Sequence, residues 1–214
     1  MSIQFKAILF DFDGVLGRTM DDNYSAWVKA LAEYNVVMDA EDYYLQEGRK
    51  ASEIAEYATR NYGFPPETVM KITDLKDTNY LNDNKFSFYE DVPAVIEWVR
   101  SLGLKVGVVS GGSKKRLLDP RVVELLNTFD VVVTASDYSV GKPSPEPYLT
   151  AARALNLDPK DCLVVENAPL GIEAAKEAGM KCIAITSTLN KKYLSRADHI
   201  IDFLREVTGA LEYL

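Results

Sequence analysis

The chain has 214 residues, 47% of them hydrophobic and 26% charged, which is enough for one domain or for a core with an insertion. Its formal net charge of −8 disfavours nucleic acid as a partner, because nucleic-acid-binding proteins are usually basic. No apolar run reaches membrane-span length, and the N-terminus lacks a signal-peptide pattern. Cys162 and Cys182 each open an apolar run, so we expect buried free thiols in a cytoplasmic protein without a membrane partner.

The stretch Ala7–Leu16 carries the first functional signal. Its short apolar run is typical of a buried strand in a parallel sheet and ends in Asp11 and Asp13, after which Gly14 permits a sharp turn. Ligands of such sheets bind beyond the carboxyl ends of the strands, where Asp11 would lie. Two carboxylates this close repel each other, so either both are solvated in a turn or a cation lies between them. Mg²⁺ suits the second interpretation, because it prefers carboxylate and carbonyl oxygens.

Residues 20–82 contain helix signals and no convincing strand. A first helix, capped by Asp21 or Asp22, is expected to turn one apolar face inward. That face consists of Tyr24, Trp27, Val28 and Leu31. A second helix is expected over residues 50–61, and a third from Pro66 to about residue 80, since proline is favoured in a first turn.

The segment Gln46–Ala51 lies between the first two of these helices. It places Gly48 beside two cations, Arg49 and Lys50. In a chain this acidic, such a cluster could bind an anion, because a phosphate site here needs its own local cations. The alternative is that the cluster is simply the solvated start of a helix.

After this helical segment, helix and strand signals alternate, which predicts an α/β fold with a doubly wound parallel sheet. The strands are expected at 105–110, 131–135, 162–166, 182–186 and 199–201, and the helices at 92–102, within 113–126, through 148–155, at 170–178 and at 203–211. Pro120 either kinks the second of these helices or, with Asp119 as cap, starts a new one. We therefore expect a core domain of residues 1–17 and 84–214, interrupted by a helical cap of residues 18–83.

Polar residues follow four of the expected strands, and parallel strands would bring them to one edge of the sheet. They are Asp11 and Asp13, Ser110 with Gly111 and Gly112, Lys142 in the loop 141–147, and Glu166 with Asn167. Taken singly, each could be an ordinary strand end or turn. Together they supply what phosphoryl transfer needs: acids that can hold Mg²⁺, a cation, a hydroxyl and open backbone amides.

The sequence resembles the haloacid dehalogenase superfamily in four ordered motifs. DFDGVL, VVSGGS, GKPSPEP and VVENAPLGIEAAKEAGM are similar to the superfamily's motifs, spread over residues 7–16 and 105–186. The branch that it resembles has a helical cap inserted after the first motif and holds phosphoglycolate phosphatase-like and β-phosphoglucomutase-like enzymes. The resemblance implies a Rossmann-like core with such a cap, in agreement with the pattern of elements.

The resemblance also implies roles for individual residues. Asp11 would be the nucleophile that forms an aspartyl-phosphate, and Asp13 the general acid and base. Ser110, Gly111 and Lys142 would bind the phosphate. Mg²⁺ would be bound by Asp11, Glu166, Asn167 and the backbone carbonyl of Asp13. The cap loop at Gly48 and Arg49 would bind the substrate.

The sequence departs from the pattern of the superfamily in three places. Asn167 stands where an aspartate metal ligand is usual, and its amide oxygen can still bind Mg²⁺ but adds no charge. Gly17 and Arg18 stand where many members have an apolar residue and an aspartate, so the hinge into the cap can differ. Pro120 interrupts the helix after Ser110 and can shift the turn at residues 112–115.

The first hypothesis is therefore a Mg²⁺-dependent phosphatase that acts on a small phosphorylated metabolite, as a monomer or weak homodimer. A sugar-phosphate mutase with the same aspartyl-phosphate is the alternative, since both need Asp13 and a closing cap. A dehalogenase is disfavoured, because that chemistry has no use for a metal or for an acid at Asp13. A non-catalytic phospholigand-binding protein would not need to retain Asp11, Asp13 and Lys142 together.

Overall fold

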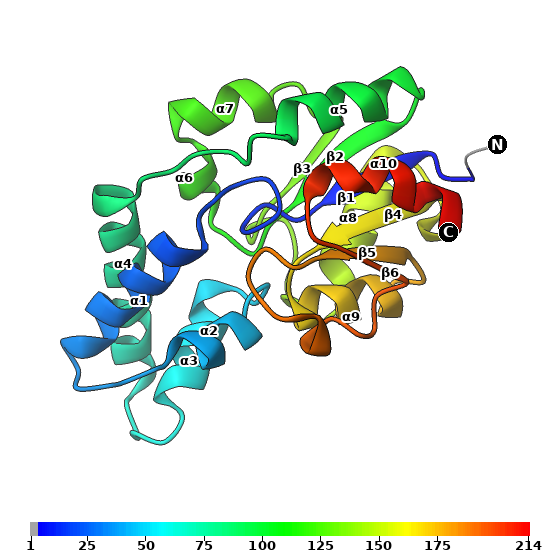
Figure 1. Cartoon of the computed structure of the whole chain (residues 1–214). Coiled ribbons are helices and arrows are strands. Elements are labelled where there is room, and N and C mark those ends of the chain that lie inside the picture. Colours follow the sequence, from blue (N-terminus) through cyan, green and yellow to red (C-terminus); the bar gives the residue numbers. More distant parts are fainter. Residues whose placement is uncertain (1–3) are drawn as a thin grey trace.

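The computed structural model describes residues 4–214, in which six strands form one parallel sheet in the order β3-β2-β1-β4-β5-β6 (Figure 1). The strands are β1 (Ala7–Phe10), β2 (Lys105–Val109), β3 (Val131–Val133), β4 (Cys162–Glu166), β5 (Lys181–Ile185) and β6 (His199–Ile201). Phe10 pairs with Val108 of β2 on one side and with Val165 of β4 on the other. The residues that follow β1, β2 and β4 consequently emerge together at one edge of the sheet.

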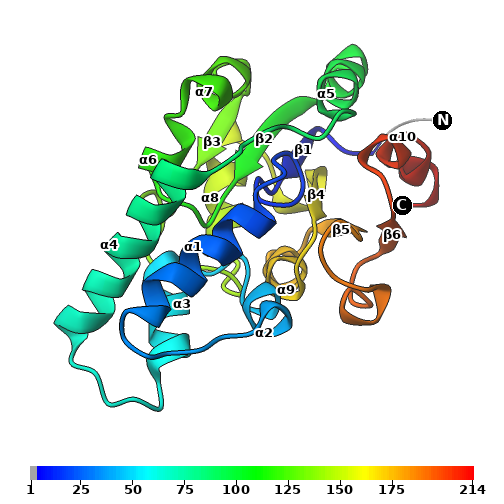
Figure 2. The same cartoon turned by 60° about the vertical axis from the view of Figure 1, so that its left-hand side comes forward.

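Helices cover both faces of this sheet, as the alternating pattern predicts (Figures 1 and 2). One apolar cluster contains Ile8 and Phe10, and the opposite cluster contains Ala7 and Leu9, because successive strand residues point to opposite faces. The first cluster is covered by α5 (Val92–Ser101), α7 (Pro120–Leu126) and α10 (Val207–Ala210), and the second by α8 (Glu146–Leu155) and α9 (Pro169–Glu177). The doubly wound α/β fold is thus confirmed.

Four further helices lie between β1 and β2 in the chain. They are α1 (Met20–Ala32), α2 (Ala40–Leu45), α3 (Ala51–Thr59) and α4 (Pro66–Asp83). They enclose an apolar cluster of their own, which includes Trp27, Tyr43 and Ile72. In both views this four-helix segment stands beyond the end of the sheet toward which β1 runs (Figures 1 and 2). It therefore faces the edge where the polar strand ends emerge.

The first of these helices differs in detail from the expectation. Thr19 is its N-cap residue, whereas Asp21 and Asp22 lie in the first turn, where they complement the helix dipole instead of capping it. Val28 is 41% exposed, so it does not belong to the inward face. Asn23 is buried there in its place, because its side chain takes part in a polar network described below.

Other local differences have simple causes. Helix α2 has six residues, too few for a periodic signal, and is capped by the Asp39 side chain. Pro120 starts α7, since the Asp119 side chain accepts a hydrogen bond from the N–H of Arg121, and the preceding turn forms the separate helix α6 (Lys114–Leu117). The expected closing helix consists of α10 between two short 3-10 turns.

Two sequence-based expectations concern simpler properties. Cys162 and Cys182 are buried, free thiols, as predicted. Within residues 4–214, no helix combines the length and the apolar character that crossing a membrane requires.

Candidate active site

Lys142 connects two carboxylates at the edge of the sheet. Its fully buried Nζ lies 2.6 Å from Oδ1 of Asp11 and 2.7 Å from Oε1 of Glu166, and it donates to the carbonyl of Val109 at 3.1 Å. Burial disfavours the charged lysine, but the two carboxylates outweigh this and raise the Lys142 pKa. Burial and the neighbouring Glu166 raise the pKa of Asp11 well above its ordinary value, against the effect of Lys142.

Glu166 is held rigidly by its neighbours. The Tyr148 hydroxyl donates to its Oε1 at 2.8 Å, and the backbone N–H groups of Asn167 and Ala168 donate to its Oε2 at 2.9 and 3.2 Å. A side chain at Gly171 would place a Cβ 1.7 Å from Oε1, so this position on α9 must remain glycine for Glu166 to lie where it does. Tyr148 and Gly171 are site residues that strand-end reasoning misses, because both come from helices.

Asn167 has a fixed orientation beside the first motif. Its Nδ2 donates to Oγ1 of Thr188 at 3.0 Å, and the hypothetical Cβ of Gly14 would lie 2.2 Å from the same nitrogen. Within residues 4–214, no donor forms a hydrogen bond with its Oδ1. The amide oxygen is therefore available as a ligand, whereas the amide nitrogen is already used.

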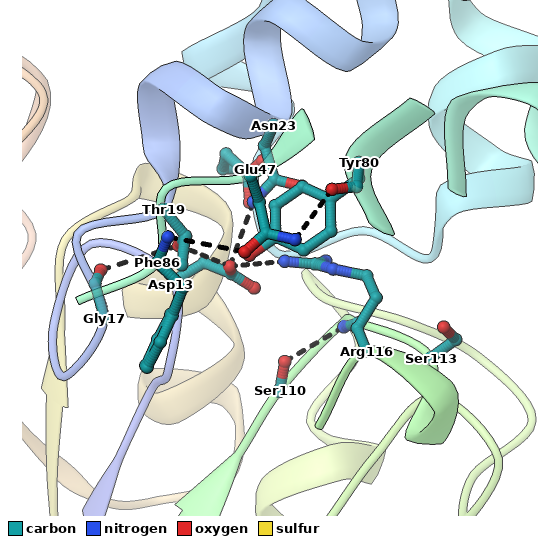
Figure 3. A network of polar contacts seen from close by, with 12 residues as sticks. Asp13, Gly17, Thr19, Asn23, Glu47, Tyr80, Phe86, Ser110, Ser113 and Arg116 are labelled. Atoms are coloured by element: carbon teal, nitrogen blue, oxygen red, sulfur yellow. Dashed lines mark hydrogen bonds and ion pairs between the residues drawn. The ribbon is translucent and has the colours of Figure 1, made fainter. Parts of the chain in front are cut away.

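Three donors converge on a single oxygen of Asp13 (Figure 3). Thr19, Arg116 and Asn23 donate to its Oδ1 at 2.5, 2.7 and 3.0 Å. Burial works against the charged carboxylate, but Arg116 and Thr19 outweigh it and hold the pKa of Asp13 below its ordinary value. The second oxygen, Oδ2, accepts no hydrogen bond from residues 4–214, which leaves it for exchange of a proton with a bound molecule.

The loop after β2 and the loop between α2 and α3 are in direct contact. Ser110 is buried, and its Oγ accepts a hydrogen bond from the N–H of Gly112 at 3.0 Å. A Cβ at Gly111 would lie 2.8 Å from the carbonyl oxygen of Arg49 and 2.9 Å from that of Gly48. Gly111 therefore allows the backbone of the helical segment to rest on the backbone of the core.

Further contacts hold the helical segment against the core. The Lys50 ammonium donates to the Tyr138 carbonyl at 2.6 Å, and the Gly141 N–H donates to Oε1 of Glu53 at 3.2 Å. Gly48 has a φ of +95°, a conformation that favours glycine, and a Cβ there would lie 2.9 Å from Cδ of Lys142. The structure is thus closed over the lysine and its two carboxylates.

The cavity between the two parts of the chain is small, about 20 Å³, which is room for about one water molecule. Asp11, Asp13, Gly48, Arg49 and Gly111 line it, so the cavity brings together residues expected from both parts of the chain. Ser110, Lys142, Glu166 and Asn167 lie around its base through the contacts described above. The structure therefore brings all the residues expected at the site together.

Four residues of the same cavity are not expected from the strand ends: Asn23, Glu47, Lys76 and Arg116. Burial and the nearby Asp13 raise the pKa of Glu47 to about 7. Burial and the nearby Arg116 lower the pKa of Lys76 to about 8. Glu47, Lys76 and Arg116 lie on helices or in turns that contain many other charged residues. Nothing in the sequence therefore distinguishes these three as site residues.

The donor atoms at the strand ends fit a hard divalent cation. Two carboxylates, Asp11 and Glu166, lie beside the free amide oxygen of Asn167 and the backbone of Asp13, and all of these groups offer oxygen. Within residues 4–214, no group of three His, Cys, Asp or Glu side chains is arranged around one metal position. Any such site would therefore need ligands besides carboxylates, such as the amide of Asn167, the backbone carbonyl of Asp13 or water.

Residues 8–185 match the model of the haloacid dehalogenase-like hydrolase family, and the chain belongs to this family. With the fold and the acidic strand ends described above, this defines an enzyme of the phosphatase type, which acts on phosphorylated substrates.

Three similar proteins show the range of this family. The chain is 31% identical to validoxylamine A 7'-phosphate phosphatase from Streptomyces hygroscopicus subsp. limoneus, over 95% of this chain and 96% of that protein. It is also 31% identical to (DL)-glycerol-3-phosphatase 1 from Arabidopsis thaliana, over 94% of this chain and 72% of that protein. The crystal structure of β-phosphoglucomutase from Clostridium difficile is similar with a TM-score of 0.83 and 25% identity, over 98% of this chain and 96% of that one.

Proposed function

We propose that the protein is a Mg²⁺-dependent phosphatase that hydrolyses a small phosphorylated metabolite through an aspartyl-phosphate on Asp11. The observation that carries this proposal is the contact of 2.6 Å between Asp11 and the buried ammonium of Lys142, at the bottom of a closed cavity. A carboxylate held beside a fixed cation can attack a phosphoryl group without repelling it, because the cation offsets the charge on the equatorial oxygens.

In the first half of the reaction, Oδ of Asp11 forms a bond to phosphorus while the bond to the leaving oxygen breaks. Asp13 enters this step protonated, because the negative charge of a bound phosphoryl group raises its pKa against the effect of Arg116 and Thr19. It donates the proton to the leaving oxygen, and its free Oδ2 is the atom suited to do so. Ser110 and the N–H of Gly111 bind the phosphoryl oxygens. In the second half, Asp13 accepts a proton from a water molecule that attacks the aspartyl-phosphate, which releases phosphate and restores Asp11.

Asp11, Glu166, Asn167 and the backbone carbonyl of Asp13 would hold Mg²⁺. When bound, the ion would neutralise charge on the phosphoryl group and orient it for in-line attack. The net charge of the ligands is lower by one unit than with an aspartate at position 167, because Asn167 is neutral. The hydroxyl of Thr188 accepts a hydrogen bond from Nδ2 of Asn167, which keeps the amide oxygen of Asn167 directed away from Thr188.

Residues 18–83 are proposed to form the cap, and residues 1–17 with 84–214 the core. Gly48 and Arg49 would contact the substrate from the cap side, since both line the same cavity as Asp11. Because the cavity is closed by the Lys50–Tyr138 and Glu53–Gly141 contacts, the cap must open for a substrate to enter.

A sugar-phosphate mutase is the second candidate, and the likeness to β-phosphoglucomutase supports it. Such an enzyme would transfer the phosphoryl group from Asp11 to a sugar hydroxyl instead of to water. Closure of the cap over Asp11 favours transfer to a bound hydroxyl, because it excludes bulk water.

The experiment is a screen of phosphate release from a panel of phosphorylated metabolites, with and without Mg²⁺. Products are identified as well as free phosphate, so that transfer to a second hydroxyl is detected. The proposal expects release that requires Mg²⁺ and Asp11. Conversion of a sugar phosphate to its isomer without release would favour the mutase, and binding without either product would support a phospholigand-binding protein.

A further inference from the structure

Three backbone N–H groups directly precede Lys142 in the chain, and two different parts of the molecule supply their acceptors. The first two, at residues 139–140, donate to the Glu146 carboxylate of α8 at 2.8 and 2.9 Å. The third, at Gly141, donates to Oε1 of Glu53 on α3 at 3.2 Å. The N–H group of the residue next to Lys142 is therefore bound by the four-helix segment, whereas the two before it are bound by the core.

The same end of α3 also holds the start of this loop. Lys50 is the N-cap residue of α3, and its ammonium donates to the Tyr138 carbonyl at 2.6 Å and lies 4.9 Å from the centre of the Tyr138 ring. The N–H of Lys50 donates to Oε2 of Glu53 at 2.9 Å, so this carboxylate is bound by the helix and by the loop at once. A cation thus binds a carbonyl at one end of the loop 138–141, and an anion binds an N–H at the other.

Tyr138 extends this contact to the loop after β2. Its side chain is buried, and its hydroxyl donates to the carbonyl of Ser110 at 3.1 Å. Beyond the other end of the loop 138–141, Lys142 places its ammonium on Asp11. Two residues proposed to bind the phosphoryl group are therefore attached to the loop that α3 holds.

The sequence of this loop fits the close approach of α3. A Cβ at Gly141 would lie 2.6 Å from Oε2 of Glu53 and 3.0 Å from the backbone nitrogen of Lys50. The φ angle of Gly141 is not in the left-handed region, so this angle does not call for glycine. Contact with α3 therefore explains why a side chain cannot be accommodated at this position.

We propose that Lys50 and Glu53 are positioning residues, through which closure of the four-helix segment completes the phosphoryl site. The inference rests on the proposed function and concerns how that site is regulated. When the segment moves away, the loop 138–141 exchanges these two partners for water and retains its contacts to Glu146. The placement of Lys142 is then less constrained, and a displacement of about 1 Å at a catalytic group can reduce the rate about a hundredfold. Phosphoryl transfer is thereby confined to the closed state.

Such a role differs from contact with the substrate. Lys50 and Glu53 act on the loop beside the phosphoryl group, which every substrate shares, so their loss should lower kcat by a similar factor for all leaving groups. A residue that binds the leaving group would instead change the ratio between substrates. The expected effect is on kcat more than on KM, because the charge that Lys142 offsets grows in the transition state.

The kinetic test uses glycerol phosphate, glucose phosphate and acetyl phosphate at saturating Mg²⁺. Lys50→Met should lower kcat about tenfold on each compound that the wild type hydrolyses, and Glu53→Ala should do the same. Lys50→Arg, which can still donate to the Tyr138 carbonyl, should restore most of the rate. Lys71→Met, at an exposed position of α4, is the matched control and should behave as wild type.

Hydrogen exchange reports on the loop without turnover. The amide of Val140 serves as an internal reference, because its acceptor Glu146 lies outside the four-helix segment. Lys50→Met should accelerate exchange at Gly141 about tenfold and at Val140 less than about twofold, since loss of one closing contact lowers the population of the closed state. Two-dimensional NMR of the protein without substrate resolves the two amides. Equal acceleration of both, or of neither, would contradict the dependence of this loop on α3.

The kinetic outcomes separate this inference from the proposed function. If Lys50→Met and Glu53→Ala keep kcat within about twofold of wild type on every compound, the inference is wrong and the phosphatase function stands. A loss confined to one compound places these residues on its leaving group and also contradicts the inference. Should Lys50→Met fail to fold, Glu53→Ala decides by the same two measurements. No phosphate release by the wild type from any phosphorylated metabolite refutes the phosphatase function, and the inference with it.

Discussion

Asp11 shares one lysine with Glu166, and this sharing defines the chemistry at the bottom of the cavity. The Lys142 ammonium, within 2.7 Å of both carboxylates, is the only side chain that ion-pairs with either of them in residues 4–214. Burial of two anions with one cation leaves a net negative charge, which a divalent cation would neutralise. The proposed nucleophile and the proposed Mg²⁺ site would therefore be coupled through Lys142 and Glu166.

Replacing Asp11 by asparagine should abolish turnover while the fold is retained. The amide is nearly the same size but cannot form the covalent phosphoryl intermediate, so we expect a loss of about a thousandfold or more in kcat. Phosphate release and circular dichroism would be measured side by side. Asp74→Asn, at an exposed position of α4, is the control and should behave as wild type. A variant with more than about a tenth of the wild-type rate would exclude Asp11 as nucleophile.

Replacing Asn167 by aspartate should lower the Mg²⁺ concentration needed for half-maximal activity. The added carboxylate raises the negative charge of the ligands by one unit, and hard cations bind more tightly as that charge rises. Calorimetric titration of Mg²⁺ into both proteins gives the same comparison without turnover. Thr188→Val is the companion variant: it removes the acceptor of Asn167 Nδ2 and should weaken Mg²⁺ binding. An unchanged affinity in both variants would show that Asn167 is not a ligand.

Site residues at strand ends can be predicted from the sequence, whereas those on helices cannot. Asp11 and Glu166 follow contiguous apolar runs, so the sequence predicts both the strand that each one ends and the edge of the sheet at which they lie. Lys76 is one of many polar residues on α4, and which side of that helix faces Asp13 depends on how it packs against α1. Arg116 depends on the start of α7 at Pro120, which sets the turn before it.

At the scale of elements, the loop between α2 and α3 is the part of the helical segment that closes the site. Its carbonyl groups at Gly48 and Arg49 would lie within 2.9 Å of a Cβ at Gly111. The contact is between two backbones, so no rearrangement of side chains can relieve the clash that an added methyl group would cause. The sequence predicts α1, α3 and α4 in this order, but not the short helix α2. It does not predict this contact, which depends on the tertiary arrangement of two separate loops.

Gly111→Ala should therefore hinder closure. We expect kcat to fall about tenfold or more, because closure excludes water and aligns the cavity residues. Small-angle scattering would reveal a larger average radius in the variant than in the wild type. Gly209→Ala on α10 is the matched control, since a Cβ there meets no atom within 4 Å. If Gly111→Ala and the wild type have equal radii and equal kcat, the prediction is wrong, and contact between the two loops is not needed for turnover.

At the scale of the whole molecule, the buried charges of the cavity make stability depend on pH. Glu47 has an ordinary pKa of 4.5 and a pKa of about 7 in the folded protein, because of burial and the nearby Asp13. Between these values the folded protein binds more protons at Glu47 than the unfolded chain. The contribution of Glu47 to the free energy of unfolding consequently falls as the pH rises through this window.

Glu47→Gln should remove this contribution. Relative to wild type, the variant should gain on the order of 1–2 kcal/mol in free energy of unfolding between about pH 4.5 and about pH 7.5. Urea unfolding at several pH values measures the difference, in which the other titrating groups largely cancel. Glu56→Gln, at an exposed site on α3, should show no such trend. A pH-independent difference for Glu47→Gln would place its carboxyl in solvent.

The two connections between the sheet and the four-helix segment run side by side. The N–H of Arg18 donates to the Ser87 carbonyl at 2.8 Å, and that of Tyr89 to the Leu16 carbonyl at 3.0 Å, so the chain leaves the core and returns to it at one point. An inserted unit with adjoining ends can be exchanged for another without altering the register of any strand. Under the proposed function, substrate range and bond-breaking chemistry can therefore change independently, one by replacement of the insert and the other by point substitution at the strand ends.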